Sequence, residues 1–335
     1  MALARFAAIR AVAMVAIALV VSVAIFAAVE LLPGDAATSI LGQNATPERV
    51  EQVREQLQLG AGPVERYTSW LSGVARGDFG ESVLTQRPVW DVIETPVRNS
   101  LVLGAVAFGA MSLIAVTFGA VAGRRPGSRT DRIVSATAAG AVAVPDFVLG
   151  GVLIAVFASW LDLFPAVSLV PVGSSPLTDP VILILPAATL ALFGGAFGAR
   201  LIRAVVADAS SAPHVEAAVL AGLPERTVVV RHLLPPIIAP LAQVLASLAP
   251  YAVGGTIVVE RLFGYPGVGA TLIDQLAARD VTVVEAIGLL LTVVVLGALF
   301  TADVVGAAAD PRRLTGASTD ADGDVVGATT AGVGA

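Results

Sequence analysis

The segment 215–240 carries the residues whose types and spacing are best suited to a specific interaction. Its sequence, VEAAVLAGLPERTVVVRHLLPPIIAP, is partly polar and lies between two strongly hydrophobic stretches. Small alanine side chains give a low face that fits deep into a groove of another protein, and Glu216 adds one charge for a basic group there. These residues predict a docking loop over 204–236, although an ordinary amphipathic loop without a partner also fits them. The residues assigned to docking are Glu216, Ala217, Ala218, Ala221, Gly222, Leu234 and Pro235.

Two short helices are predicted on either side of Gly222. Pro213 is suited to the first turn of a helix that continues through Ala218. Gly222 permits a positive φ and Pro224 cannot continue the helical hydrogen bonds, so the chain is expected to turn there. A second helix then starts at Glu225 and runs back toward the next hydrophobic stretch.

The chain lacks the side chains of several common catalytic sites. It has no cysteine, which excludes disulfides, thiolate metal sites and thiol catalysis. All twenty basic residues are arginine, so no lysine is present for a P-loop or a Schiff base. His214 and His232 are far apart in the sequence and isolated, which argues against a metal site. The chain therefore cannot be a standard P-loop ATPase by itself. We also expect no catalytic residue, no cofactor, no bound metal and no nucleic-acid partner.

Asp146 and Asp303 lie within hydrophobic stretches, where a charge is costly. Asp146 could face an aqueous translocation path and attract the amino group of a substrate. It could also lie at a membrane interface or pair with an arginine of another subunit. Asp303 lies near the end of the last stretch, where pairing with a boundary arginine is favoured over a role in transport.

Charged residues around 260–280 form a further candidate surface. They could receive an extracytoplasmic protein, and a solvated loop explains them equally well. The adjoining segment 263–269, FGYPGVG, is better explained as a bend that returns the chain to the membrane than as a phosphate cradle. The charged residues are Glu260, Arg261, Asp274, Arg279 and Asp280.

The composition indicates a membrane protein. Hydrophobic residues make up 56% of the chain, charged residues only 14%, and the mean hydropathy is +0.85; a soluble domain carries about 25% charged residues. A helix needs roughly 20 apolar residues to cross a bilayer. Six stretches qualify and predict an all-α protein with six transmembrane helices. They lie at about 11–29, 101–123, 133–160, 181–199, 237–259 and 283–305.

Arginine placement predicts the orientation of these helices. The short loop 124–132 contains four arginines and one aspartate, whereas residues 30–98 contain six arginines and ten carboxylates. Because loops rich in arginine stay in the cytoplasm, both termini and the docking loop are expected there. The first hydrophobic stretch exceeds the core of a signal peptide, so we interpret it as an uncleaved anchor rather than a cleaved signal.

The sequence therefore divides into four parts. Residues 1–29 form the N-terminus and first transmembrane helix, and residues 30–98 form a small helical extracytoplasmic insert. Residues 99–307 form the transmembrane core with its docking loop, and residues 308–335 form a disordered tail. Within the insert, helices are predicted at about 46–57 and 64–76, followed by a turn at 77–80.

The docking loop resembles the cytoplasmic signature of binding-protein-dependent ABC importer permeases: Glu-Ala-Ala, three residues, Gly, then Leu-Pro after eleven more. Other stretches are similar to the dipeptide, oligopeptide and nickel branch of that family, and the similarity covers about residues 5–314. Asp146, Ala36 and His232 depart from the usual pattern of the family. The departure at Asp146 leaves undetermined which residues line the substrate path. The matching stretches are 31–35 (LLPGD), 46–48 (TPE), 76–82 (RGDFGES), 87–89 (RPV), 126–128 (PGS), 144–145 (VP), 231–232 (RH), 263–269, 279–280 (RD), Asp303 and 310–312 (DPR).

This resemblance implies a type I ABC importer permease with its insert between spans 1 and 2. It implies four kinds of partner: a second homologous permease, expected to be a different chain, two cytoplasmic ATPases, an extracytoplasmic solute-binding protein, and membrane lipid. The ATPases would bind the Glu-Ala-Ala loop and hydrolyse the ATP, so this chain would be non-catalytic. The expected substrates are di- and oligopeptides, with nickel or another small solute as the alternative, and the expected location is a bacterial plasma membrane.

Two functions of another class fit parts of the sequence. A stand-alone secondary transporter usually places ionisable residues along its path, but such residues are scarce here and the docking loop would have no role. A membrane scaffold without transport activity is the other. Co-purification with an ATPase separates the importer subunit from both.

Overall fold

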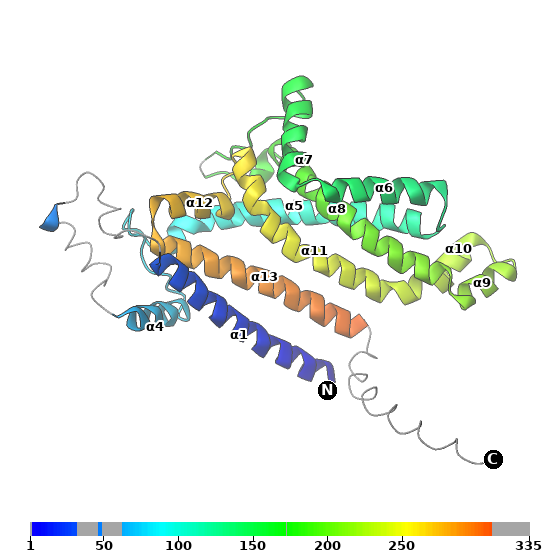
Figure 1. The fold of residues 1–335 in the computed structure, drawn as a ribbon, viewed down its shortest axis with the longest axis horizontal. Helices are drawn as coiled ribbons and strands as arrows, with labels where there is room; N and C mark the ends of the chain where they lie inside the picture. The colour runs from blue at the N-terminus through cyan, green and yellow to red at the C-terminus, as the bar shows by residue number, and fades with distance from the viewer. Residues whose placement is uncertain (1, 32–45, 49–61, 172, 310–335) are drawn as a thin grey trace, which may run out of the picture.

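The computed structural model describes residues 2–31, 46–48, 62–171 and 173–309. The part of the chain that it describes is built from helices and short connections (Figure 1). The elements are α1 (Ala2–Glu30), α4 (Pro63–Val74), α5 (Val89–Gly123), α6 (Arg129–Ala143), α7 (Asp146–Leu153), the π-helix η2 (Ile154–Trp160), the 3₁₀-helix η3 (Pro176–Thr178), α8 (Val181–Ser210), α9 (Pro213–Leu220), α10 (Glu225–Thr227), the π-helix η4 (Val228–Leu233), α11 (Leu234–Phe263), α12 (Val268–Ala278) and α13 (Val281–Ala309).

Helices α5, α8 and α11 enclose the main hydrophobic core. Leu103 and Met111 of α5, Ile202 of α8 and Leu248 of α11 are fully buried in it. Glycines bring α5 and α8 close together, as the small-residue pattern predicts: a methyl group added at Gly195 would lie 2.7 Å from the side chain of Ile114. Close packing of this kind is the usual means of association between helices in a membrane.

Five helices in the described part of the chain are long and apolar enough to cross a membrane. They are α1, α5, α8, the continuous helix from Glu225 to Phe263, and α13. The pair α6 and α7–η2 adds a sixth span when taken together. α1 packs beside α13 and leaves most of its surface exposed (Figure 1). The residues of the main core therefore come from the helices that follow α1.

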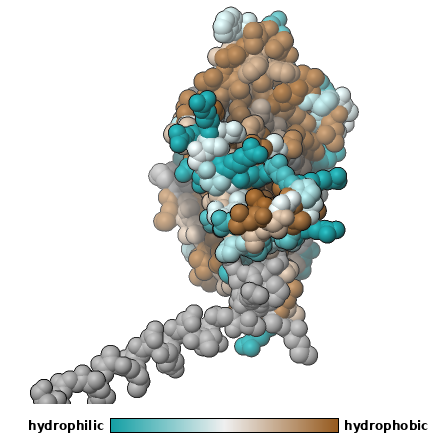
Figure 2. Space-filling model, turned by 90° about the vertical axis from the view of Figure 1, so that its right-hand side faces the viewer, coloured by the Kyte–Doolittle hydropathy of each residue, from teal (hydrophilic) through white to brown (hydrophobic). Residues whose placement is uncertain are grey.

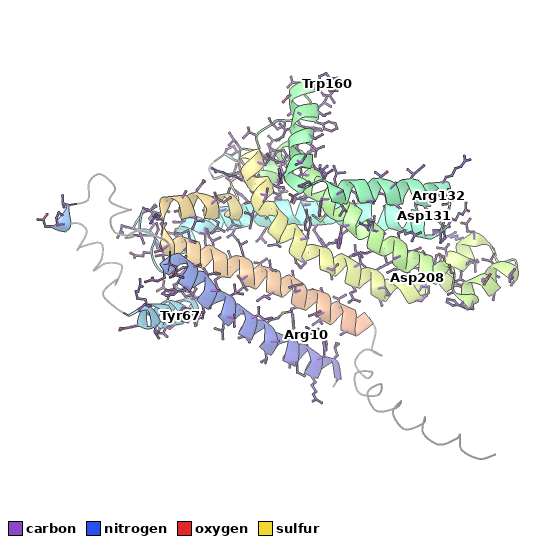
Figure 3. All side chains as sticks on the ribbon, in the orientation of Figure 1. Arg10, Tyr67, Asp131, Arg132, Trp160 and Asp208 are labelled. Carbon is purple, nitrogen blue, oxygen red and sulfur yellow. The ribbon has the colours of Figure 1, made fainter. Side chains whose placement is uncertain are left out.

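The third predicted span is not one continuous helix. α6 and α7–η2 meet at an angle of 100°, and Trp160 lies at the far end of the arm that projects from the bundle (Figure 3). Pro145 explains the break, because a proline disfavours helical geometry in the residue before it. Val144 accordingly has extended angles, φ −95° and ψ 126°. The predicted span at about 133–160 thus corresponds to two helices with a bend between them.

Helix α5 begins twelve residues before the predicted span, at Val89. Its first turns are held by a second cluster, in which Val89 and Ile93 pack against Val283 and Ile287 of α13. Nearby, α4 lies against the end of α1. The hydroxyl groups of Tyr67 and Ser22 are 2.8 Å apart, and Arg66 pairs with Glu30.

The predicted helix at 64–76 corresponds to α4. Most of the predicted helix at 46–57 and the predicted tail at 308–335 lie outside the described residues, apart from 46–48 and 308–309.

Candidate docking site

The predicted helix–turn–helix is confirmed and lies at one end of the long helices (Figure 1). We call residues 213–228 the knob. α9 starts with Pro213, the turn has Gly222 at φ +75°, and Pro224 precedes α10. The N–H of Gly222 donates to the carbonyl of Val219 at 2.9 Å. Only glycine adopts this left-handed angle without a steric cost, so the turn depends on it.

The knob has a small hydrophobic core of its own. Val215 and Ala218 of α9 and Val228 of η4 are buried together. This places Ala218 inside the knob, whereas the sequence placed it on the same exposed face as Ala217 and Ala221. The reason is geometric: residues 215 and 218 are three apart, so they share the side of the short helix that faces η4.

The opposite side of the knob is an exposed apolar face. Leu220 is 83% exposed, Val219 59% and Leu223 39%, and Ala217 and Ala221 are exposed beside them. Figure 2 looks onto this end and shows a hydrophobic patch among hydrophilic residues. Glu216 is also exposed and makes no ion pair within the described residues. Sequence reasoning missed the three larger side chains, because apolar residues on a short helix are usually read as core.

The Leu234-Pro235 end of the motif lies at the base of the knob. Pro236 has no N–H to donate to the carbonyl of His232, four residues earlier. The His214 ring fills that place, with its Nε2 atom 3.2 Å from the His232 carbonyl oxygen. The prolines thus free a carbonyl that fastens α9 to η4. The His214 ring thus contacts the backbone of His232, and within the described residues no group of three metal-ligating side chains is found.

Ion pairs connect the knob to α5, and a further ion pair lies next to them between α6 and α8. Glu225 of the knob pairs with Arg124 and, at 3.6 Å, with Arg125, both at the end of α5. Behind them, Arg203 of α8 donates to both oxygens of Asp131 at 2.9 and 2.8 Å. Figure 3 shows Asp131 at this end of α6, close to α8. The arginine-rich loop 124–132 therefore has a structural role, because its residues form ion pairs with the knob and with α8.

Asp146 lies at the first residue of α7, beside the break after α6. One carboxylate oxygen accepts from the N–H of Phe147 at 2.8 Å. The other lies 3.4 Å from the hydroxyl of Tyr251, whose ring stacks on Phe193 with centroids 5.1 Å apart. All three side chains remain half-exposed, and no ion pair of Asp146 is found within the described residues.

The segment 263–269 is a structural bend, as expected. Glu260 is fully buried and fills the turn: its carboxylate accepts from the N–H groups of Gly269 at 2.8 Å and Ala270 at 3.1 Å, and from the Ser100 hydroxyl. The hydroxyl of Tyr265 donates to the carbonyl of Asn99 at 2.7 Å. We call residues 260–270 the outer turn.

The candidate charged surface at 260–280 is therefore not uniformly solvated. Glu260 is buried in the outer turn, and Asp280 is buried beside Ser82 and the N–H of Val83. Arg261 and Asp274 form an exposed pair at 2.9 Å. Reading all of them as members of one exposed loop is wrong for the two buried carboxylates.

At the other end of the molecule, the predicted pairing of Asp303 with an arginine is confirmed, at 3.5 Å from Arg10.

Comparison with known proteins identifies the family. Residues 115–315 match the family described as the binding-protein-dependent transport system inner membrane component, and residues 3–103 match the N-terminal domain of such components. A putative peptide transport system permease of Brucella abortus is 32% identical over 88% of this chain and 94% of its own length. The glutathione transport system permease of Escherichia coli K12 is 32% identical over 87% of this chain and 93% of its length.

A probable peptide ABC transporter permease of Sinorhizobium fredii is 29% identical over 84% of this chain and 90% of its own length. The matches therefore extend over nearly the whole chain rather than over the docking loop alone. The chain belongs to the family of binding-protein-dependent inner-membrane transport components, and it is a multi-pass permease subunit of an ABC importer.

Proposed function

We propose that the knob couples this permease to a cytoplasmic ATPase. The observation that carries the proposal is the exposed face of Val219, Leu220 and Leu223, which is displayed on a unit with a core of its own. A small preformed unit can transmit a displacement, because its internal contacts need not rearrange when a partner binds. The residues assigned to coupling are Glu216, Ala217, Ala218, Ala221, Gly222, Leu234 and Pro235, with Ala218 acting from inside the knob.

The complex contains two ATPases, a second homologous permease that is a different chain, and an extracytoplasmic solute-binding protein. ATP hydrolysis takes place in the ATPases. ATP closes the ATPase dimer, and the docked knobs carry that movement through α8 and α11 to the translocation path. The free energy of coupling comes from a difference in ATPase affinity between the two states of the path.

The substrates are di- or oligopeptides, with nickel or another small solute as the alternative. The names of the Brucella, Sinorhizobium and Escherichia relatives, which refer to peptides and glutathione, support a peptide substrate. Asp146 lines the translocation path, where its carboxylate attracts the amino group of a peptide. Its half-exposed position beside Tyr251 is consistent with that role.

Both termini and the knob lie in the cytoplasm, and the insert at 30–98 lies outside. The start of α1 and the end of α13 are the ends of these two helices that lie nearer the knob in Figure 1, which supports this orientation. The divisions at 1–29, 30–98, 99–307 and 308–335 follow from it.

The decisive experiment is Ala217→Arg, which places a long charged side chain on the exposed face. We expect uptake and ATPase co-purification to be lost while the protein still reaches the membrane. Ala75→Arg, the same change at an exposed residue after α4, is the control and should transport normally. Normal uptake by Ala217→Arg would refute the coupling role, and uptake in vesicles without ATP would favour a secondary transporter.

A further inference from the structure

The arm that leaves the bundle after α6 carries groups that nothing else in the described residues satisfies. We call residues 146–163 the arm, which comprises α7, η2 and the turn that follows them. Its two helical parts have 8 and 7 residues and are together about 20 Å long. Trp160, at the end of η2, is 81% exposed and lies well away from the bundle in Figure 3.

The arm points sideways, within the plane of the membrane. α1, α5 and α13 are each long and apolar enough to cross a membrane, and they run roughly along the long axis of the molecule (Figure 1). This axis is therefore close to the membrane normal. The arm makes an angle of 100° with α6, which packs along α5 and α8, so it stands across that axis.

The arm starts near the middle of the bilayer. Its first residue, Asp146, lies 3.4 Å from the hydroxyl of Tyr251. About one turn before Tyr251, Leu248 lies against Gly198, which also contacts Ala115. Ala115 is close to the centre of the predicted second span. An arm that leaves at this depth and across the membrane normal stays within the hydrocarbon region, which is about 30 Å thick.

The tip of the arm is unsuited to lipid. After Trp160 the chain leaves the helix, and Asp162 has a positive φ of 51°. Asp162 is exposed, and within the described residues neither its carboxylate nor its N–H has a hydrogen-bond partner. At this depth, irregular backbone and an ionised carboxylate are tolerated where protein, or water enclosed by protein, surrounds them.

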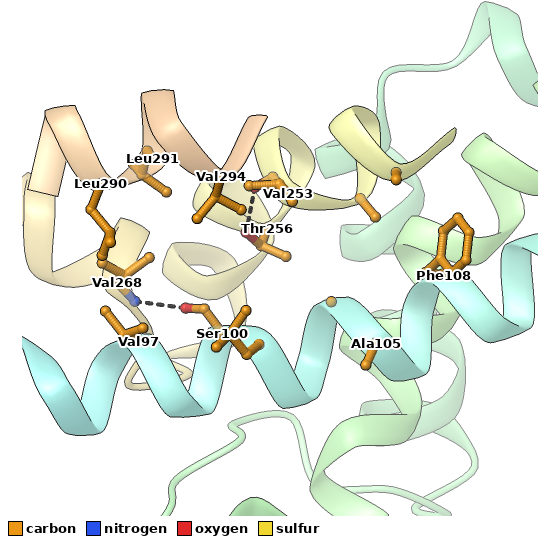
Figure 4. Close-up of a pocket in the computed structure, with 14 residues that line it drawn as sticks. Val97, Ser100, Ala105, Phe108, Val253, Thr256, Val268, Leu290, Leu291 and Val294 are labelled. Carbon is orange, nitrogen blue, oxygen red and sulfur yellow. Dashed lines mark hydrogen bonds between the residues drawn. The ribbon is translucent and has the colours of Figure 1, made fainter. Parts of the chain in front are cut away.

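A groove between α5, α11, α12 and α13 shows the contrast (Figure 4). Both of its hydroxyl groups are hydrogen-bonded within the chain: Ser100 accepts from the N–H of Val268, and Thr256 donates to the carbonyl of Val253, each at 2.7 Å. Lipid can cover such a surface without leaving a polar group unpaired. At the tip of the arm it would leave the carboxylate and the N–H of Asp162 unpaired, which selects a polypeptide as the occupant there.

We infer that the arm inserts into the second permease subunit, where a basic or hydrogen-bond-donating group pairs with Asp162. The inference rests on the proposed function, which supplies that subunit. Of the proposed partners, the ATPases bind the knob and the solute-binding protein lies outside the membrane, so the second permease is the one that shares the depth of the arm. The exposed side chains of Phe147, Val152 and Trp160 then pack between its helices.

Photocrosslinking of the full chain with its co-purifying subunits tests the inference. A photoreactive phenylalanine derivative replaces Trp160 or, in a second variant, Val152, which is 52% exposed on the same arm. In a third variant it replaces Leu220 of the knob, which is 83% exposed. We expect positions 160 and 152 to capture the second permease and position 220 to capture an ATPase. Capture at 160 and 152 of phospholipid alone, of another copy of this chain, or of the same chain overturns the inference.

The three positions also separate this inference from the coupling role of the knob. Capture of an ATPase at 220, without the second permease at 160 or 152, overturns the inference and leaves the coupling role standing. Capture of the second permease at 160 or 152, without an ATPase at 220, supports the inference and counts against the coupling role.

Asp162→Asn tests the pairing at the tip, because asparagine tolerates the positive φ of this turn and the change removes the charge. We expect the affinity for the second permease to fall by at least about tenfold, since its pairing group is left without a carboxylate. The amount of second permease retained on the immobilised chain measures it. Glu65→Gln, at an exposed carboxylate of α4, is the control and should leave retention unchanged. Equal retention by the two variants would overturn the pairing assigned to Asp162.

Discussion

The knob and the outer turn are both short glycine-containing turns between helices, yet their surroundings differ. In the outer turn, a methyl group added at Gly267 would lie 2.2 Å from the carboxylate of Glu260. In the knob, a methyl group added at Gly222 meets no atom within 4 Å. The outer turn uses its hydrogen-bond donors internally and has no spare space. The knob buries only three side chains and leaves its larger apolar residues outside, where a partner can reach them.

The comparison predicts its largest effect at Gly267. Gly267→Ala forces the Glu260 carboxylate to move and breaks its hydrogen bonds to the outer turn, because the backbone of Gly267 has ordinary angles but no room for a side chain. We expect a loss of about 3 kcal/mol in the free energy of unfolding, as for overpacked buried sites. Thermal unfolding in detergent measures it.

A second glycine controls for the change itself. Gly254→Ala lies in α11 with open space around it, and should leave stability unchanged or raised by up to about 1 kcal/mol, since alanine favours helix. Equal unfolding temperatures for the two variants would show that the outer turn tolerates a side chain, and the contrast with the knob would fail.

Glu260→Gln tests the outer turn from the side of the carboxylate. The carboxylate accepts three hydrogen bonds, whereas glutamine turns an N–H₂ group toward at least one of these donors. We expect a loss of about 1–3 kcal/mol. Asp274→Asn makes the same change in an exposed ion pair and should cost less than about 1 kcal/mol. A smaller effect at 260 than at 274 would contradict the buried network.

The sequence predicted the knob better than the outer turn for a physical reason. The bounds of α9 depend on Pro213, Gly222 and Pro224, whose backbone preferences are local and can be read residue by residue. The burial of Glu260 depends on Ser100, which is 160 residues away in the chain. A contact of that kind leaves no local pattern, so the sequence does not distinguish this carboxylate from the exposed ones around it.

The membrane spans show the same difference between features that the sequence predicts and features that it does not. Hydropathy located all the apolar stretches, because it averages over about twenty residues. The same averaging hid the break at Pro145, which changes the direction of the chain by 100°. It also missed the first turns of α5, because Val89 and Ile93 are buried only through contacts that are distant in the chain, with Val268 of α12 and with α13.

A smaller effect is expected at Gly222, where a positive φ rather than crowding limits substitution. Gly222→Ala should cost about 1–2 kcal/mol, confined to the knob because nothing packs against the site. Hydrogen exchange of residues 215–228 measures this local opening. Gly222→Asn is the control and should cost less, since asparagine tolerates this conformation. Unchanged exchange in Gly222→Ala would mean that the turn is not held in its observed form.

The smallest effect is expected for the ion pair that tethers the knob. Arg124 and Glu225 are 40% and 66% exposed, so water and salt screen their attraction. A double-mutant cycle with Arg124→Ala and Glu225→Ala, read out by hydrogen exchange of the knob, should give a coupling of about 0.5 kcal/mol that decreases with added salt. A weak tether suits a unit that moves with a partner. A coupling above about 2 kcal/mol, insensitive to salt, would instead make the knob as fixed as the outer turn and remove the basis of their contrast.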